Sequence, residues 1–254
     1  MKYLLWKTCL LMFVSLTPLF AQKTPDGFDL NSEGMAFYSV ENYDAAVKSF
    51  SRAAELMPND ASIRFNIASS YAKLRQFDRA AESYLQVTKM RPNDPVAFNE
   101  LGVAYKEIQQ YAQSERALAE AVRLNPRSAL YQFNLASLEI KNKKFREAGE
   151  HLLIAKELDE NDATTRIYLG YVYAQKKKYP QAIAEMSKGV ELQPLNQEFR
   201  FLLGNLYLLA NEKDKALDQY AVVKQNDPEL ANRLYQNIYR DKLLVLSFDG
   251  QPVR

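Results

Sequence analysis

A 34-residue period governs where hydrophobic, small and proline residues stand along this chain. Small residues recur at one position of every period, and large aromatic or aliphatic residues recur at others in register with them. Five prolines follow the same period, with Glu160 in the place of a sixth. A fixed period of this length is typical of a repeat architecture. The prolines are Pro58, Pro92, Pro126, Pro194 and Pro228, and the small residues are Gly34, Ala68, Gly102, Ala136, Gly170 and Gly204.

Each period predicts two helices that pack as an antiparallel hairpin, as residues 95–128 illustrate. Leu101, Gly102 and Tyr105 share one face at helical spacing, and Leu118 belongs to the apolar face of the following segment. Gly102 has no side chain, so the two backbones can approach closely and Tyr105 and Leu118 fill the remaining space. The proline near the end of the unit lacks an amide hydrogen and stops the second helix.

Six such units fill residues 27–230 without an insertion. A single hairpin cannot bury both of its apolar faces, so we expect an all-α, right-handed superhelix of stacked hairpins whose concave groove is formed mainly by the first helices. Residues 231–241 continue a helical pattern and are expected to cap the open end. The pattern of residues 242–254 indicates no function. The units are residues 27–60, 61–94, 95–128, 129–162, 163–196 and 197–230.

The repeated order of small, aromatic, small, aromatic and proline positions resembles that of tetratricopeptide repeat proteins. Three positions depart from it: Glu139 and Lys213 replace aromatic residues, and Glu160 replaces proline. These departures predict looser packing in the fourth and sixth units. The resemblance implies that the chain binds a protein or peptide, without implying which one, and the fold alone does not define function.

Side chains of the first helices that do not pack within the hairpins are expected to point into the concave groove. Amides can donate to and accept from a peptide backbone, and aromatic rings supply apolar pockets. We therefore expect an extended segment of a protein partner to bind here; the alternative is that the aromatic rings pack on one another and meet no partner. The expected binding residues are Phe65, Asn66, Asn99, Phe133, Asn134, Tyr168, Tyr171, Phe201 and Asn205.

Some tetratricopeptide repeat proteins hold the terminal carboxylate of a partner with cationic groove residues. The corresponding positions here hold Phe65, Ser69, Val96 and Glu100, so that arrangement is not expected. Basic residues instead recur near the ends of the first helices. They could attract an acidic partner, an anionic lipid surface or an acidic polysaccharide, or they could complement the helix dipole as solvated ends. This basic stripe comprises Lys73, Lys106, Lys141, Lys144 and Lys177.

Catalytic and cofactor chemistry finds little support in the sequence. His151 is the only histidine, Cys9 is the only cysteine, and no glycine-rich phosphate loop is present. His151 precedes the packing residue Leu152 on a second helix and is expected near the outer surface. We therefore predict no catalytic residues, no metal site and no cofactor.

Residues 1–21 have the pattern of a secretory signal peptide. Lys2 and Lys7 precede an apolar run, and cleavage is expected after Ala21, which leaves residues 22–26 as a short segment before the repeats. No later stretch is apolar enough to span a membrane. Of the 33 basic residues, two lie in this leader, so 31 remain against 31 acidic ones, and a neutral chain is a poor candidate for nucleic-acid binding.

The sequence thus predicts a periplasmic or secreted, non-enzymatic adaptor that binds a partner protein in its groove, with an envelope assembly as a possible setting. Two alternatives stay open. The chain could bind a carbohydrate or another envelope polymer through groove aromatics and the basic stripe. It could also be a structural spacer whose groove binds nothing.

Overall fold

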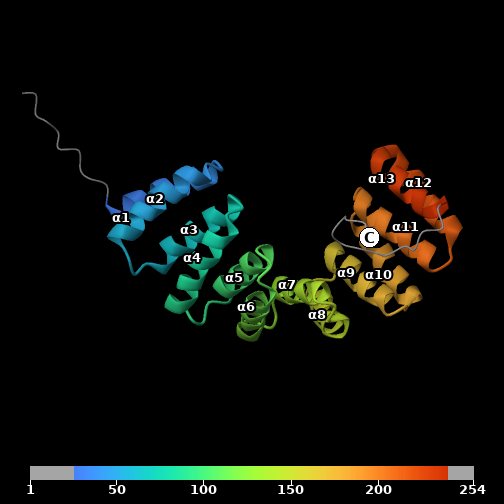
Figure 1. The fold of residues 1–254 in the computed structure, drawn as a ribbon, viewed down its shortest axis with the longest axis horizontal. Coiled ribbons are helices and arrows are strands. Elements are labelled where there is room, and N and C mark those ends of the chain that lie inside the picture. Colours follow the sequence, from blue (N-terminus) through green and yellow to red (C-terminus); the bar gives the residue numbers. More distant parts are fainter. Residues whose placement is uncertain (1–25, 240–254) are drawn as a thin grey trace, which may run out of the picture.

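The computed structural model describes residues 26–239, which form thirteen α-helices joined by short turns and contain no strand (Figure 1). The helices are α1 Gly27–Ser39, α2 Tyr43–Leu56, α3 Ala61–Lys73, α4 Phe77–Met90, α5 Pro95–Glu107, α6 Tyr111–Leu124, α7 Ala129–Lys141, α8 Phe145–Leu158, α9 Ala163–Gln175, α10 Tyr179–Leu192, α11 Gln197–Leu209, α12 Lys213–Asn226 and α13 Pro228–Tyr239.

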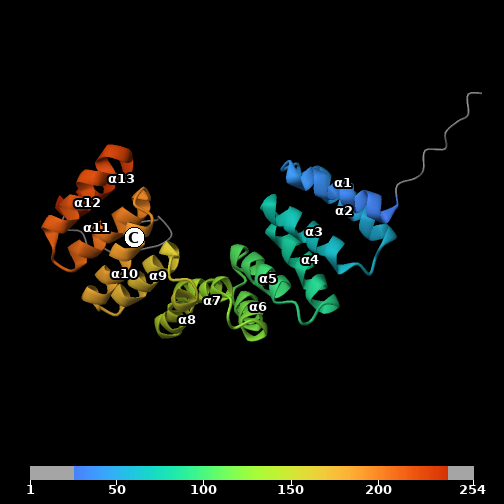
Figure 2. The same ribbon diagram turned by 180° about the vertical axis from the view of Figure 1, so that it is seen from behind.

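Consecutive helices pair into six hairpins, and each hairpin packs on the next to form an arch (Figure 1). Helices α7 and α8 lie at the middle of the arch. In the views from the front and from behind, the first helices α5, α7 and α9 lie on its inner side and the second helices α6, α8 and α10 on its outer side (Figure 2). The last helix, α13, packs on α11 and α12. The prediction of an all-α stack of helical hairpins with a terminal capping helix is confirmed.

Close approach of the two helices of a hairpin depends on the small residues of the first helix. A Cβ atom on Gly34 would lie 2.5 Å from the ring of Phe50, and one on Gly102 would lie 2.5 Å from Cγ of Leu118. Phe50 and Leu118 are themselves fully buried. The pairing of small and large positions predicted from the sequence is therefore a close packing contact between the two helices of these hairpins.

A side-chain cap begins every first helix and recurs with the same 34-residue period. Its oxygen accepts a hydrogen bond from a backbone amide of the first turn, as Asp94 does from Val96 N at 3.0 Å. Such caps stabilise a helix start by about 1 kcal/mol. The capping residues are Asp26, Asp60, Asp94, Ser128, Asp162 and Asn196.

The turn inside each hairpin contains one residue with a left-handed backbone, and none of these residues is glycine. Such a backbone is strained for a residue with a Cβ atom. Each turn is closed by backbone hydrogen bonds that link its residues to the preceding helix. The left-handed residues are Glu41, Arg75, Gln109, Lys143, Lys177 and Asn211, with φ between 57° and 64°.

Long side chains join neighbouring repeats by bonding to the loop that precedes their helix. The guanidinium of Arg64 donates to the carbonyl oxygen of Pro58, and Arg200 donates to that of Pro194 at 3.0 Å. Arg166 makes the same bond to the carbonyl of Glu160, at 2.9 Å. Since this bond uses the backbone oxygen, the replacement of proline by Glu160 leaves the junction intact.

The fourth hairpin contains a polar pair where the sequence predicted looser packing. Glu139 occupies the aromatic position, and its Oε2 lies 2.8 Å from Nδ1 of His151, with 6% of the Glu139 side chain and 25% of the His151 side chain exposed. His151 was expected near the outer surface, and 25% of its side chain is exposed. Its ring is partly buried between α7 and α8 because it hydrogen-bonds the carboxylate that replaces the aromatic residue.

Some predictions fall outside the described residues. These are the signal peptide at residues 1–21, most of the short segment at residues 22–26, and the tail at residues 242–254. The capping helix was expected at residues 231–241; α13 begins earlier, at Pro228, and residues 240 and 241 also lie outside the description. No helix within residues 26–239 is long and apolar enough to cross a membrane.

Candidate functional site

The inner face of the arch is made by first helices that contact one another through asparagine pairs. Nδ2 of Asn134 donates to Oδ1 of Asn99 at 2.8 Å, which links α7 to α5. Asn66 donates to Asn31 at 3.3 Å, which links α3 to α1. These amides hydrogen-bond to each other between adjacent repeats, so they act first as joints of the stack.

Two of the amides expected in the groove are buried. Asn99 is 1% exposed, and its Nδ2 also donates to the carboxylate of Glu100 at 2.9 Å. Asn205 is 5% exposed and accepts a hydrogen bond from Asn237 of α13 at 2.8 Å. The expectation that these two side chains point freely into the concavity is therefore wrong, because each is enclosed between neighbouring helices.

The aromatic residues predicted for the groove lie on the first helices and are partly buried. The rings of Phe133 and Tyr168 meet edge to face at 4.9 Å between centroids, linking α7 to α9. The other rings contact a second helix of the same or the preceding hairpin, or a cation. Phe65 packs edge to face on Tyr84 at 5.3 Å, Tyr171 lies 6.2 Å from Phe145, and the guanidinium of Arg233 lies 5.0 Å from the ring of Phe201.

One pair of these rings, Phe133 and Tyr168, packs together as in the alternative that the sequence left open, and part of each of the five rings stays at the surface. The rings therefore form a semi-rigid apolar floor on the first helices rather than free side chains. Whether a partner covers this floor stays a prediction.

Four exposed apolar side chains on the first helices extend this floor. Val96 is 44% exposed and Leu130 is 57% exposed. Helical spacing places Val96 on the same face of α5 as Asn99, and Leu130 on the same face of α7 as Asn134. The inner ridge, as we call it, comprises Phe28, Met35, Val96 and Leu130.

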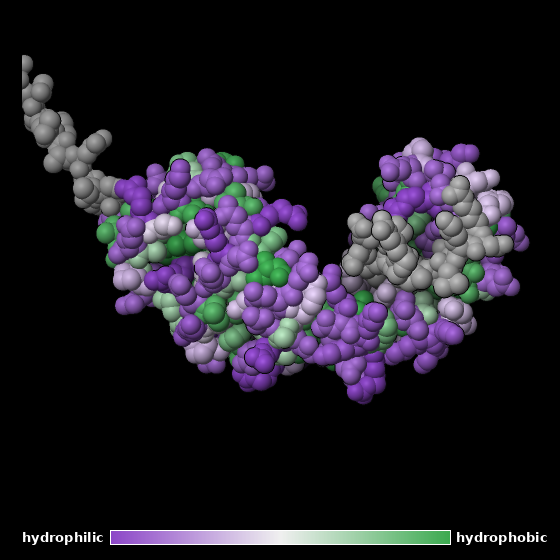
Figure 3. Space-filling view, viewed as in Figure 1, coloured by the Kyte–Doolittle hydropathy of each residue, from purple (hydrophilic) through white to green (hydrophobic). Residues whose placement is uncertain are grey.

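The inner ridge was not predicted from the sequence as a contact surface. The sequence signal for the ridge is an apolar residue at the second position of several first helices. Val96 is one of these residues, and only its lack of charge entered the prediction. Figure 3 shows hydrophobic atoms at the surface among hydrophilic ones on the arm that contains α1 to α6.

The residues of the basic stripe are placed differently from one another. Lys144 donates to Glu115 at 2.6 Å, and Nζ of Lys141 lies 5.8 Å from the ring centroid of Tyr111. Lys177 occupies the strained turn position, and Lys73 is exposed in the last turn of α3. Lys106 is partly buried on α5, and burial lowers the pKa of its ammonium group. The stripe is therefore not one uniform surface.

Glu139 and His151 form a carboxylate–imidazole pair, which is an arrangement also found in acid–base catalytic sites. The hydrogen bond that Nδ1 of His151 makes to the Glu139 carboxylate raises the pKa of His151, and burial opposes that effect. Within residues 26–239 no three His, Cys, Asp or Glu side chains are grouped to hold a metal ion. The pair lies between two packed helices, where it supports the hairpin.

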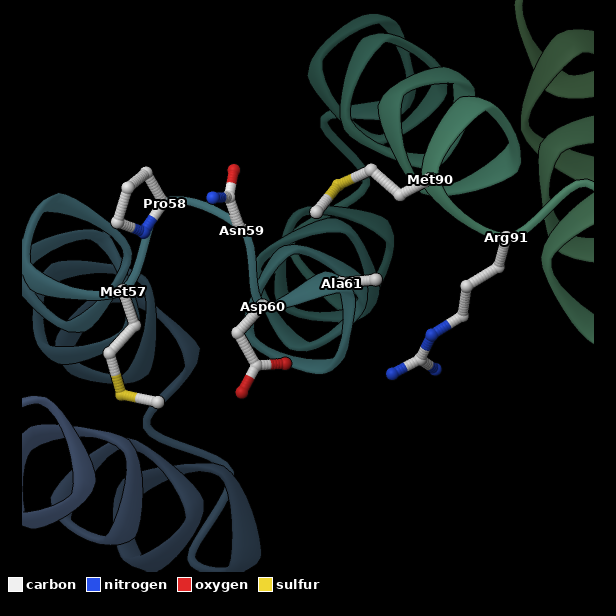
Figure 4. A pocket seen from close by; sticks show the side chains of 7 residues that line it. All are labelled: Met57, Pro58, Asn59, Asp60, Ala61, Met90 and Arg91. Carbon is white, nitrogen blue, oxygen red and sulfur yellow. The ribbon is translucent and has the colours of Figure 1, made fainter.

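An open pocket of about 610 Å³ lies where the loops before α3 and α5 approach each other (Figure 4). Its polar side chains already have structural partners. Asp60 accepts from the backbone amide of Ser62 at 2.7 Å, and Arg91 donates to the Ser62 hydroxyl at 2.6 Å. The rest of the lining includes Met57 and Met90, so the pocket offers no set of converging reactive groups.

The fold and its repeated helix-turn-helix contacts define a tetratricopeptide repeat protein. Residues 30–235 match the family described as the C-terminal domain of cilia and flagella-associated protein 70, which is a tetratricopeptide repeat family. Since this match spans most of the chain, the chain belongs to that family. None of the curated proteins matches the chain.

Solved structures share the fold at low sequence identity. PilF of Pseudomonas aeruginosa has a TM-score of 0.70 and 18% identity, over 83% of this chain and 96% of that one. The Cut9–Hcn1 hetero-tetramer of the APC/C has a TM-score of 0.69 and 17% identity over 84% of this chain, which spans only 43% of the matched chain. YrrB, described as a TPR protein with an unusual peptide-binding site, has a TM-score of 0.62 and 21% identity, over 75% of this chain and 99% of that one.

Proposed function

We propose that this protein is a non-catalytic scaffold whose inner face binds an extended segment of a partner protein. The observation that carries the proposal is the inner ridge beside the aromatic floor. Val96 and Leu130 remain exposed although neighbouring positions on α5 and α7 are buried. Exposed apolar side chains on the same set of helices as partly exposed aromatic rings are typical of an interaction surface.

A partner segment would gain stability by covering these side chains. Burial of apolar surface contributes roughly 25 cal/mol per Å². Because the rings of the floor already pack against other side chains, little side-chain ordering would accompany binding, and less affinity would be lost to entropy. YrrB offers a precedent in the same fold, since its description names a peptide-binding site.

The proposed setting is outside the cytoplasm, in the periplasm or the surrounding medium. It rests on the leader pattern of residues 1–21, with its two lysines before an apolar run and Ala21 after it. An envelope assembly is accordingly the proposed context for the partner. Analysis of the N-terminus of the exported protein would show whether it begins at Gln22.

The scaffold proposal is tested by comparing two double variants with the wild-type chain. Val96→Ser with Leu130→Ser removes apolar surface from the inner face. The matched control, Ile154→Ser with Leu158→Ser, removes similarly exposed apolar surface from α8 on the outer side. All four side chains are exposed, so both double variants should fold, which circular dichroism would check.

The proteins retained from an extract of the producing cells would be quantified on immobilised protein. We expect the inner-face variant to retain at least tenfold less partner than the wild type. The outer-face variant should retain as much as the wild type. Equal retention by the two variants would contradict the proposal. Loss only with the outer-face variant would move the site to α8.

A further inference from the structure

Helix α5 carries a cation that the described fold does not pair. Five lysine or arginine side chains within residues 26–239 are partly buried, and four of them donate to an acceptor. Lys106 is the fifth, and it makes no hydrogen bond or ion pair among these residues. The four paired cations are Arg64, Lys156, Arg166 and Arg200.

A second cation lies near Lys106 and increases its electrostatic cost. Lys141 repels the Lys106 ammonium group, and burial disfavours its charge as well, so both effects lower its pKa. Glu107, the next residue of the chain, opposes this shift in part, but it is exposed and makes no ion pair with Lys106. Partly buried charges without a counter-ion are costly, which is why they are rarely left unpaired.

Lys106 is placed to meet a ligand on the inner face. Helical spacing sets Val96, Asn99 and Lys106 on the same side of α5. The rise of an α-helix separates Val96 from Lys106 by about 15 Å along the axis, and an extended chain covers that distance in about five residues. One extended segment can therefore contact the inner ridge and Lys106 together.

We propose that Lys106 forms a subsite for an acidic side chain of the partner segment. The inference rests on the proposed scaffold function and specifies the partner: an extended segment with an apolar residue and an aspartate or glutamate about five residues apart. The carboxylate of the partner segment would be the counter-ion that Lys106 lacks within residues 26–239. Positions that could help to hold a terminal carboxylate contain Phe65, Ser69 and Val96 instead of cations, so the acidic group belongs to a side chain.

The test uses the full chain and a displayed library of random 12-residue peptides with amidated C-termini. Amidation removes the terminal carboxylate, so any acidic preference must come from side chains. Peptides selected on the wild-type protein should be enriched in aspartate or glutamate. Individual glutamate-containing peptides should bind at least tenfold more weakly when that residue is replaced by glutamine.

The Lys106→Met variant keeps the length of the side chain and removes its charge. Selection on this variant should lose the acidic enrichment, whereas the control Lys48→Met, which removes an exposed lysine from α2, should keep it. Lys106→Met should also raise the midpoint of thermal unfolding, since it removes an unpaired charge from a partly buried position. A lowered midpoint would mean that Lys106 supports the fold and would overturn the inference.

The two proposals fail in different ways. Peptides that bind to the inner face without acidic enrichment, or with enrichment that survives Lys106→Met, overturn the subsite but leave the scaffold function. If no displayed peptide is retained and the inner-face variant loses no partner from cell extract, both proposals are overturned.

Discussion

At the scale of single residues, the same residue type has different packing roles at different positions, as two glycines show. Gly102 faces Leu118 across the hairpin, whereas a Cβ atom on Gly149 of α8 would meet nothing closer than 3.4 Å. The asparagine joints show the limit of sequence reasoning at this scale. The partners in two of the joints, such as Asn99 and Asn134, are 35 residues apart, one more than the period, so an alignment of equivalent positions does not pair them.

Alanine at these two glycines should have opposite effects. Gly102→Ala should lower the free energy of unfolding by about 1–3 kcal/mol, because the new Cβ would clash with Cγ and the backbone nitrogen of Leu118. Gly149→Ala should leave stability unchanged or raise it by up to about 1 kcal/mol, since alanine favours helix. Urea denaturation of both variants measures this, and equal losses would refute the packing account.

At the scale of elements, the hairpin of α7 and α8 shows how a departure from the repeat pattern is accommodated. The sequence identified Glu139 as the departure and predicted looser packing. It did not identify the compensation, because His151 belongs to another helix and stands one residue before the regular packing position Leu152. The caps of the first helices do have a signal in the sequence. Asp, Ser or Asn stands at the last position before each first helix.

This pair predicts a specific dependence of stability on pH. The pKa of His151 is raised above its ordinary 6.5 by the hydrogen bond that its ring makes to the Glu139 carboxylate. A group whose pKa is higher in the folded state contributes stability that is fully present below its unfolded pKa and lost as the pH rises through the folded pKa. The free energy of unfolding of the wild type, less that of His151→Gln, should therefore fall as the pH rises above about 6.5.

Chemical denaturation of both proteins across pH 5 to 9 gives this difference. Using the difference cancels the titration of groups that do not interact with His151. A difference that is constant with pH, or that grows as the pH rises, would show that protonated His151 does not stabilise the hairpin.

At the scale of the whole molecule, the first and last helices of the stack differ in the side chains that they present at the packing positions of the repeat. On α1, Glu33 stands at the position where α3 and α5 present Ile67 and Leu101 to the preceding repeat. At the other end, Leu234 of α13 packs on Gly204 of α11, the place that a side chain of the second helix fills in earlier repeats. The stacked architecture was predictable because its contacts are local and periodic, whereas the exposure of individual inner-face side chains depends on contacts between repeats.

The polar outward face of α1 should prevent end-to-end association. Replacing Asp29 and Glu33 by leucine would give that face the apolar character of later first helices and should cause self-association. Light scattering after size-exclusion chromatography would detect a concentration-dependent rise in mass. Lys48→Leu on α2 serves as the control for a single added apolar residue, and a double variant that stays monomeric would show that the end of the stack is protected in another way.

The most direct test of the account is to locate the partner on one face of the arch. A photo-crosslinking amino acid would be placed at Leu130 on the inner side or at Ile154 on the outer side, both of which are exposed. After irradiation in cells or in extract, we expect the residue at position 130 to crosslink a discrete partner and the one at position 154 to give none. Crosslinking of the same partner only from position 154 would contradict the claim that the inner face is the binding surface.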